Sequence, residues 1–151
     1  MDTNRRKCCI MAQGIFIICF VLFPYFLLSQ SYSGIDVSHH NGKINWKEVA
    51  KDSNIKFVYI KATTGSTHTD DCYAYNIKNA RENGLKVGSY HFFTSYSSAH
   101  KQFENFKSVA KKSSQDLIPM VDVESSLEKW TKKQIQDSLL VFMRLCKSHY
   151  G

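Results

Sequence analysis

Residues 117–124 read Leu117-Ile118-Pro119-Met120-Val121-Asp122-Val123-Glu124. A short apolar run after a proline therefore ends in two acids that are separated by one valine. In a β-strand, residues two apart point to the same face, so Asp122 and Glu124 are predicted to project together. Two carboxylates directed into one cleft are typical of glycoside hydrolysis, where one serves as an acid and the other as a base or stabilising charge. On these residues alone, two acids that simply face solvent at a strand end are the alternative.

The rest of the chain alternates short apolar segments with helical ones. Strands are expected at residues 34–38, 57–62, 85–93 and 117–124, and helices at residues 46–52, 73–83, 99–111 and from Thr131 to about Ser148. Asn45 and Glu48 are expected to form a capping box, and Gly84 is expected to end the second helix. Residues 63–71 are expected to form a polar loop. Four strand–helix units in regular alternation predict an α/β fold with a parallel sheet or a barrel.

Polar residues occur at the expected carboxyl end of each strand. They are Asp36 and Ser38 on the first strand, Lys61 on the second, Tyr90 and His91 on the third, and Asp122 and Glu124 on the fourth. In α/β barrels, chemistry takes place at the carboxyl ends of the strands. Each residue alone has an ordinary explanation, but their equivalent positions on successive strands predict one site.

The N-terminal segment is predicted to direct export. Basic residues at 5–7 precede an uncharged apolar run at residues 15–28, and small residues follow at Ser29 and Ser31. This arrangement is typical of a secretory signal peptide that is cleaved before Tyr32. Counted from Cys8, the run over residues 8–28 is long enough to span a membrane, so an N-terminal membrane anchor is the alternative. The expected organisation is a signal peptide or anchor at residues 1–31 and one domain at residues 32–151, which meets the membrane only through the leader.

The formal net charge of the chain is +7 at pH 7. The basic residues are dispersed and no nucleic-acid-binding motif is present, so nucleic acid is not an expected partner. For an exported protein, the anionic envelope of a bacterium is the more plausible one. Beyond the leader only Cys72 and Cys146 remain, without metal-ligand spacing; a disulfide and two free thiols both stay open. No metal and no cofactor are expected.

Several motifs in the chain together resemble one known family. They are Gly34-Ile35-Asp36-Val37-Ser38, Lys61-Ala62-Thr63, the spacing Asp70…Tyr73…Asn76, Gly88-Ser89-Tyr90-His91-Phe92 and Asp122-Val123-Glu124. Their order and spacing are similar to those of glycoside hydrolase family 25, the Chalaropsis-type lysozymes or N-acetylmuramidases. The motifs cover nearly all of the chain after the leader, which makes the resemblance specific.

The resemblance implies an irregular, TIM-like (β/α) barrel that hydrolyses the β-1,4 bond between N-acetylmuramic acid and N-acetylglucosamine in peptidoglycan. It implies that Glu124 is the general acid, that Asp122 positions water or stabilises the cationic centre, and that Asp36 is a third acid across the groove. The residues expected to bind substrate are Tyr90, Lys61, Ser38 and His91. Glu124 has to hold a proton near neutral pH, which burial and the neighbouring Asp122 would promote. Inverting and substrate-assisted retaining mechanisms both stay open.

The chain departs from the family pattern in three places. Thr64 stands where the family often has a glutamate, and His39-His40 stands where a more neutral pair is common. The sequence ends at Gly151, whereas family members continue, so the barrel is expected to be C-terminally incomplete and the chain to have low stability and little activity. Two further interpretations follow: a catalytically weak peptidoglycan-binding domain, or a membrane-anchored fragment that pairs with another chain.

Overall fold

The computed structural model of the protein describes residues 33–124 and 129–151. The predicted leader, with its possible anchor at residues 8–28, lies outside the described residues. The strands are β1 (Ser33–Val37), β2 (Ile55–Thr64), β3 (His68–Thr69), β4 (Lys86–Phe92) and β5 (Met120–Asp122), and the helices are α1 (Trp46–Val49), α2 (Tyr73–Glu82), α3 (Ala99–Val109) and α4 (Lys132–Tyr150). Short 3₁₀ turns form at η1 (His39–Asn41) and η2 (Lys112–Ser114). Among these described helices, none combines the length and the apolar character that crossing a membrane requires.

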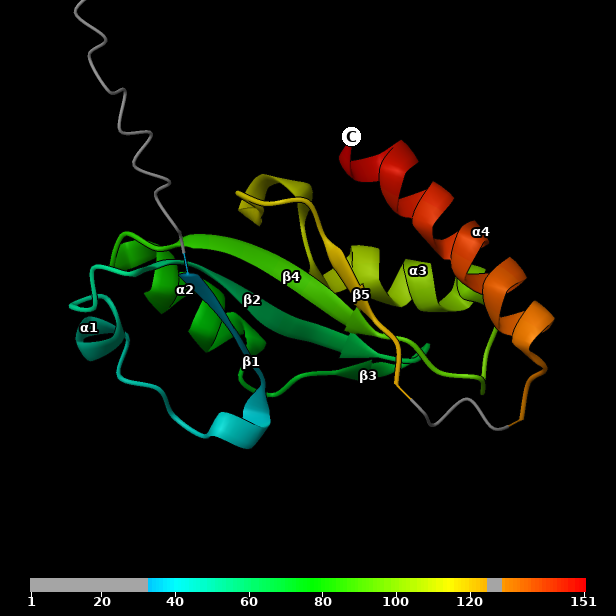
Figure 1. The fold of residues 1–151 in the computed structure, drawn as a ribbon, viewed down its shortest axis with the longest axis horizontal. Helices are drawn as coiled ribbons and strands as arrows, with labels where there is room; N and C mark the ends of the chain where they lie inside the picture. Colours follow the sequence, from blue (N-terminus) through cyan, green and yellow to red (C-terminus); the bar gives the residue numbers. More distant parts are fainter. Residues whose placement is uncertain (1–32, 125–128) are drawn as a thin grey trace, which may run out of the picture. The chain divides into compact units, whose positions relative to one another are not determined.

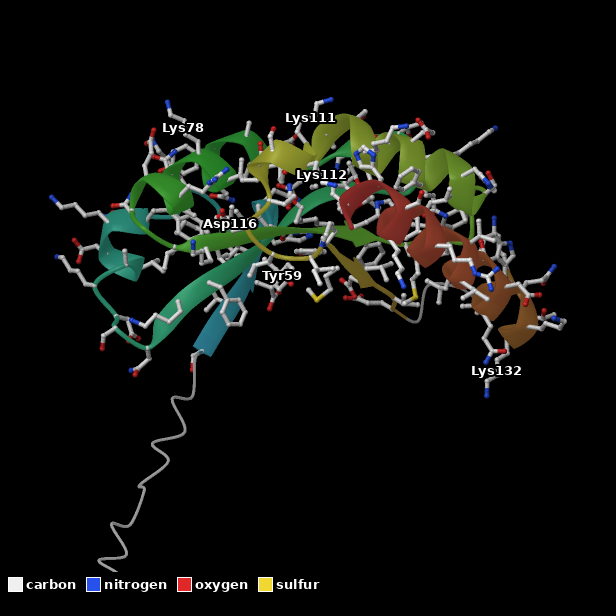
Figure 2. All side chains as sticks on the ribbon, turned by 90° about the horizontal axis from the view of Figure 1, so that it is seen from above. Tyr59, Lys78, Lys111, Lys112, Asp116 and Lys132 are labelled. Carbon is white, nitrogen blue, oxygen red and sulfur yellow. The ribbon has the colours of Figure 1, made fainter. Side chains whose placement is uncertain are left out.

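The strands form a curled, mostly parallel sheet that makes up half of a barrel (Figure 1). Its order is β1-β2-β4-β5, each neighbour is parallel, and β3 adds an antiparallel hairpin to the end of β2. Figure 2 shows the helices α2, α3 and α4 on one side of this sheet. The predicted α/β architecture of an incomplete, TIM-like barrel is therefore confirmed.

The two faces of the sheet have different environments because side chains alternate along each strand. On β2, Val58, Ile60 and Ala62 are fully buried, and on β4 Val87 is equally buried, all on the helix side. The large buried side chains there are Trp46, Phe93, Phe106 and Phe142, contributed by the helices and by the residue after β4. The main hydrophobic core therefore lies between the sheet and its helices, which leaves the opposite, inner face for other uses.

On the inner face, aromatic rings of β2 lie over glycines of the neighbouring strands. A Cβ atom on Gly34 would lie 2.0 Å from the Phe57 ring, and one on Gly88 would lie 2.5 Å from the Tyr59 ring. The Tyr59 hydroxyl also donates a hydrogen bond of 2.9 Å to the carbonyl of Ile118, just before β5. These contacts pack β1 and β4 against β2, and they connect the residue just before β5 to the same strand.

Local expectations were met at some element ends and not at others. Thr131 caps α4 in a capping box with Gln134, and Gly84 ends α2 with a positive φ of 85°. The capping box predicted at Asn45 was wrong, because the Asn45 side chain makes no capping hydrogen bond. The loop predicted at residues 63–71 contains β3, and β5 is much shorter than predicted, since Pro119 has no N–H to donate and the strand begins only after it.

An apolar surface lies along β5 and the facing side of α4. Ile118 is 75% exposed and Met120 is 41% exposed, and both line a groove of about 620 Å³ together with Leu140, Met143 and Tyr150. Within the described residues, β5 pairs with β4 alone. The half-barrel therefore has an open edge that is apolar.

Gly88→Ala is expected to destabilise the fold by about 1–3 kcal/mol, because the added methyl group collides with the Tyr59 ring. The free energy of unfolding, measured in a denaturant titration, checks this. Lys86→Ala, at an exposed position two residues earlier on β4, is the control and should have little effect. The double variant Gly88→Ala/Tyr59→Ala should lose less than the sum of its single variants; additivity would contradict the ring-over-glycine contact.

Candidate functional site

The register of the parallel strands aligns polar side chains at one end of the inner face. Asp36 pairs with Tyr59, Lys61 pairs with Tyr90, and Phe92 pairs with Asp122. Paired residues on neighbouring parallel strands point to the same side of the sheet, so Asp36, Lys61, Tyr90 and Asp122 share one face. This face is opposite the helices, and the residues lie toward the carboxyl ends of their strands, as the sequence predicts.

The buried phenol of Tyr90 lies in the field of acids from different parts of the chain. Burial, with the negative charges of Asp36, Asp122 and Asp70, raises the pKa of Tyr90 to about 12, while a hydrogen bond with the Ser38 side chain opposes the rise. Tyr90 is therefore a neutral hydroxyl at physiological pH and can donate a hydrogen bond. The arrangement combines several carboxylates with one fixed, uncharged donor.

Lys61 adds a positive charge to the same region. Its Nζ lies 4.4 Å from the centroid of the Phe92 ring, a cation–π contact across neighbouring strands. Since Phe92 is paired with Asp122, this contact places Lys61 at the level of the acids. The register shifts between Lys61 and Thr63, so Thr64, the position of the family's glutamate, is paired with Phe92.

A hydrogen-bonded contact between Asp70 and His39 fixes the loop after β1, and the sequence predicted no role for it. The carboxylate of Asp70 is fully buried; its Oδ2 lies 2.6 Å from His39 Nδ1 and accepts the His39 backbone N–H, and its Oδ1 accepts the Cys72 N–H. Ser38 precedes this contact and caps η1 by accepting from the His40 N–H. The only sequence signals were the place of Asp70 in the family-like spacing and the unusual His39-His40 pair.

Glu124 lies two residues beyond the end of β5 and is exposed, whereas Asp122 is half-buried. The Asp122 carbonyl accepts a hydrogen bond of 2.9 Å from the Phe93 N–H, so the backbone is fixed at Asp122 but the strand ends there. The burial expected for Glu124 is therefore not observed. The physical reason is its position at the open edge of the half-barrel, where β5 has no second neighbour among the described residues.

His91 is not on the inner face, which differs from the prediction that it binds substrate. Its side chain is 0% exposed, stacks on Phe142 at 4.8 Å between ring centroids, and lies 2.7 Å from Thr63 Oγ1 and 3.2 Å from Gln102 Oε1. The side chains of neighbouring residues alternate, so the inward direction of Tyr90 sends His91 toward the helices. Burial lowers the pKa of His91 to about 4, so the ring is neutral in the core.

Cys72 and Cys146 are free thiols and are not joined to each other. Burial raises the pKa of the Cys146 thiol to about 12. A search of residues 33–124 and 129–151 finds no group of three or more His, Cys, Asp or Glu side chains that could hold a metal ion. Within this part of the chain, the polar chemistry near Tyr90 consists of carboxylates, hydroxyls and Lys61.

Comparisons with known proteins agree on one family. The profile described as glycosyl hydrolases family 25 matches residues 35–151. The structure of a family 25 glycosyl hydrolase from Bacillus anthracis is similar with a TM-score of 0.73 and 36% identity, over 80% of this chain and 58% of that one. The uncharacterised protein YegX of Escherichia coli K12 is 33% identical over 127 residues, or 82% of this chain and 46% of YegX. Lysozyme M1 of Streptomyces globisporus is 49% identical over 59 residues, or 39% of this chain and 20% of that protein. The chain thus spans about half the length of YegX.

The buried His91 is expected to make stability fall as the pH is lowered. Its pKa is about 4 in the folded protein and near 6.5 when unfolded, so the unfolded state binds the proton more strongly, and stability present above pH 6.5 is lost as the pH falls toward 4. The His91 contribution to the loss is on the order of 3 kcal/mol at most. Denaturant titrations at pH 7 and pH 4.5 measure the difference.

His91→Gln should reduce this difference, because its amide does not titrate. His100→Gln, at an exposed position of α3, is the matched control and should keep the behaviour of the parent. An unchanged pH dependence in His91→Gln would contradict the assignment.

Proposed function

Because the chain belongs to glycosyl hydrolases family 25, we propose that it acts on bacterial peptidoglycan and hydrolyses the β-1,4 bond between N-acetylmuramic acid and N-acetylglucosamine. The observation that carries the proposal is the common face of Asp36, Lys61, Tyr90 and Asp122 at the carboxyl end of a parallel sheet, which the strand register sets. Glycosidic bonds are cleaved by pairs of carboxyl groups in such a setting. The similarity to Lysozyme M1 supports the same substrate class.

In this proposal Glu124 is the general acid that protonates the leaving glycosidic oxygen. Asp122 is its partner, which positions water or stabilises the positive charge that develops at the anomeric carbon, and Asp36 is the third acid across the groove. Asp36 and Asp122 both act on Tyr90 through their charges, so they lie near enough to act on one bound sugar. A sugar bound there would cover the exposed Glu124 and shield it from water, which favours the protonated form that an acid catalyst needs.

Substrate binding is assigned to Tyr90, Lys61 and Ser38. The neutral phenol of Tyr90 donates a hydrogen bond, and Lys61 supplies a positive charge for the carboxylate of a muramic acid residue. Ser38 supports the site through its hydrogen bond with Tyr90 and through its cap on η1. His91 supports the site indirectly, because its contacts with Thr63 and Gln102 fix the outer side of the strands that carry Lys61 and Tyr90.

Peptidoglycan as substrate implies that the protein acts in the cell envelope or outside the cell. The predicted leader at residues 1–31 agrees with export, either as a signal peptide or, through residues 8–28, as a membrane anchor. Two relatives carry the name lysozyme, namely Lysozyme M1 and the autolytic lysozyme of Clostridium acetobutylicum. No nucleic acid, metal or cofactor takes part in the proposed reaction.

A second candidate function is peptidoglycan binding with weak or no hydrolysis. Two observations favour it: Thr64 stands at the position of a family glutamate, and Glu124 is exposed at an open edge. Binding depends on the groove surface, whereas hydrolysis also needs a shielded acid. The same experiment separates the two functions.

The chain is expected to reduce the turbidity of purified bacterial cell walls only slowly, because Glu124 is exposed at the open edge of the half-barrel, and Glu124→Gln should abolish this residual lysis by removing the proton donor. Glu104→Gln, an exposed carboxylate on α3, is the matched control and should keep the parent rate. Circular dichroism should show equal folding of all three proteins. An active Glu124→Gln protein would contradict the assignment of the acid, and co-sedimentation with walls without lysis would support the second candidate.

A further inference from the structure

The loop between β4 and α3 exposes an aromatic side chain at the end of the sheet that carries the acids. Tyr96 is 69% exposed, and it lies four residues after the end of β4. Single exposed aromatics are common on protein surfaces and need no explanation by themselves. The surroundings of Tyr96 distinguish it from an ordinary exposed residue.

The backbone on both sides of Tyr96 is held by one buried side chain. Gln102 of α3 is 0% exposed, and its amide nitrogen donates to the carbonyls of Thr94 and Ser97, each at 2.9 Å. Its amide oxygen accepts the Thr94 N–H, also at 2.9 Å. The position of Tyr96 is therefore preorganised, so a ligand that contacts the ring does not have to order this loop.

The loop after β5 contributes a positive charge to the same place. The Nζ atom of Lys129 lies 4.7 Å from the centroid of the Tyr96 ring, a cation–π contact. Tyr96 is 69% exposed beside this contact, so much of its ring remains accessible to solvent. The segments that follow β4 and β5 thus meet at Tyr96, at the same end of the sheet as Asp122 and Glu124.

Hydroxyl groups on either side of Tyr96 have unused hydrogen-bonding capacity. The side-chain oxygens of Ser95 and Ser97 are shielded from solvent, and neither has a partner within residues 33–124 and 129–151. Buried polar groups without partners are uncommon in native proteins, and an ordered water is one explanation. These two hydroxyls lie beneath the surface, so the contact that Tyr96 offers a ligand is its exposed ring.

We propose that Tyr96 and Lys129 form a glycan-binding platform at the same end of the sheet as Asp122 and Glu124. The exposed Tyr96 ring stacks on the C–H face of an N-acetylhexosamine residue, and the Lys129 ammonium pairs with a carboxylate of the stem peptide of peptidoglycan. The platform deepens the proposed function and rests on it. Because it lies outside the acids, it holds a sugar next to the one that is cleaved.

The test uses the chain with Glu124→Gln as the parent, so that binding is measured without hydrolysis. Sedimentation with purified, insoluble peptidoglycan gives the bound fraction over a range of wall concentrations. Tyr96→Ala should weaken binding by roughly 2–10-fold through loss of the stacking surface, and Tyr96→Phe should bind like the parent. Ile118→Ala is the control, because Ile118 is as exposed as Tyr96 but precedes β5 at the opposite end of the strand. The thermal unfolding midpoints of all variants should agree, since both side chains are exposed.

A second comparison tests the role of Lys129. Lys129→Gln should weaken binding to peptidoglycan and leave binding to uncharged chitin unchanged, whereas Tyr96→Ala should weaken both. Parent-like binding of Tyr96→Ala to walls would overturn the platform and leave the proposed function standing. A parent that does not bind walls, together with an unmutated chain that does not hydrolyse them, would overturn both. Weak binding by Tyr96→Phe as well as Tyr96→Ala would overturn stacking as the mode of contact.

Discussion

The parallel register of β2 between β1 and β4 is the constraint on which the rest of the structure depends. It places Asp36 beside Tyr59 and Lys61 beside Tyr90, so side chains from distant parts of the chain lie at one level of the sheet. A shift of one residue in a strand would turn its inward side chains toward the helices. The rings over Gly34 and Gly88 oppose such a shift, because each ring fits only where the neighbouring strand lacks a Cβ atom. Packing on the inner face therefore fixes the same register that assembles the acids.

The two faces of the sheet have different roles: the helix side forms the core, and the inner side carries the candidate functional residues. On the helix side, the buried polar side chains of Thr63, His91 and Gln102 satisfy one another, and burial lowers the pKa of His91 so that its ring is neutral. On the inner side, the carboxylates of Asp36 and Asp122 share one face with Tyr90 and Lys61, a grouping of ionisable side chains that is typical of a functional site. Gln102 contributes both to the core and to the position of Tyr96, since the same amide that contacts His91 also holds the loop of Tyr96. Core packing and ligand presentation are thereby linked through one residue.

Much of the fold and several site residues could be predicted from the sequence, because alternating apolar residues and the motif spacing are local signals. The parallel α/β architecture, the placement of Asp36, Lys61 and Tyr90 toward the carboxyl ends of their strands, and the family were accessible in this way. The burial of His91 on the helix side was not predicted, although neighbouring residues of a strand point to opposite faces and Tyr90 was expected to point inward. The shift after Lys61 and the contact of His39 with Asp70 depend on residues far apart in sequence, and the exposure of Glu124 depends on what lies beside β5. These features arise from tertiary packing, which a local pattern does not contain.

The groove between β5 and α4 has a consequence for how the protein can be followed in solution. Cys146 lies in this groove, and burial raises its thiol pKa to about 12, so at neutral pH it is almost entirely the unreactive thiol. Anything that separates α4 from β5 would return the thiol toward its ordinary acidity and speed its alkylation by an electrophilic dye. The labelling rate of Cys146 would therefore report how firmly α4 packs against β5.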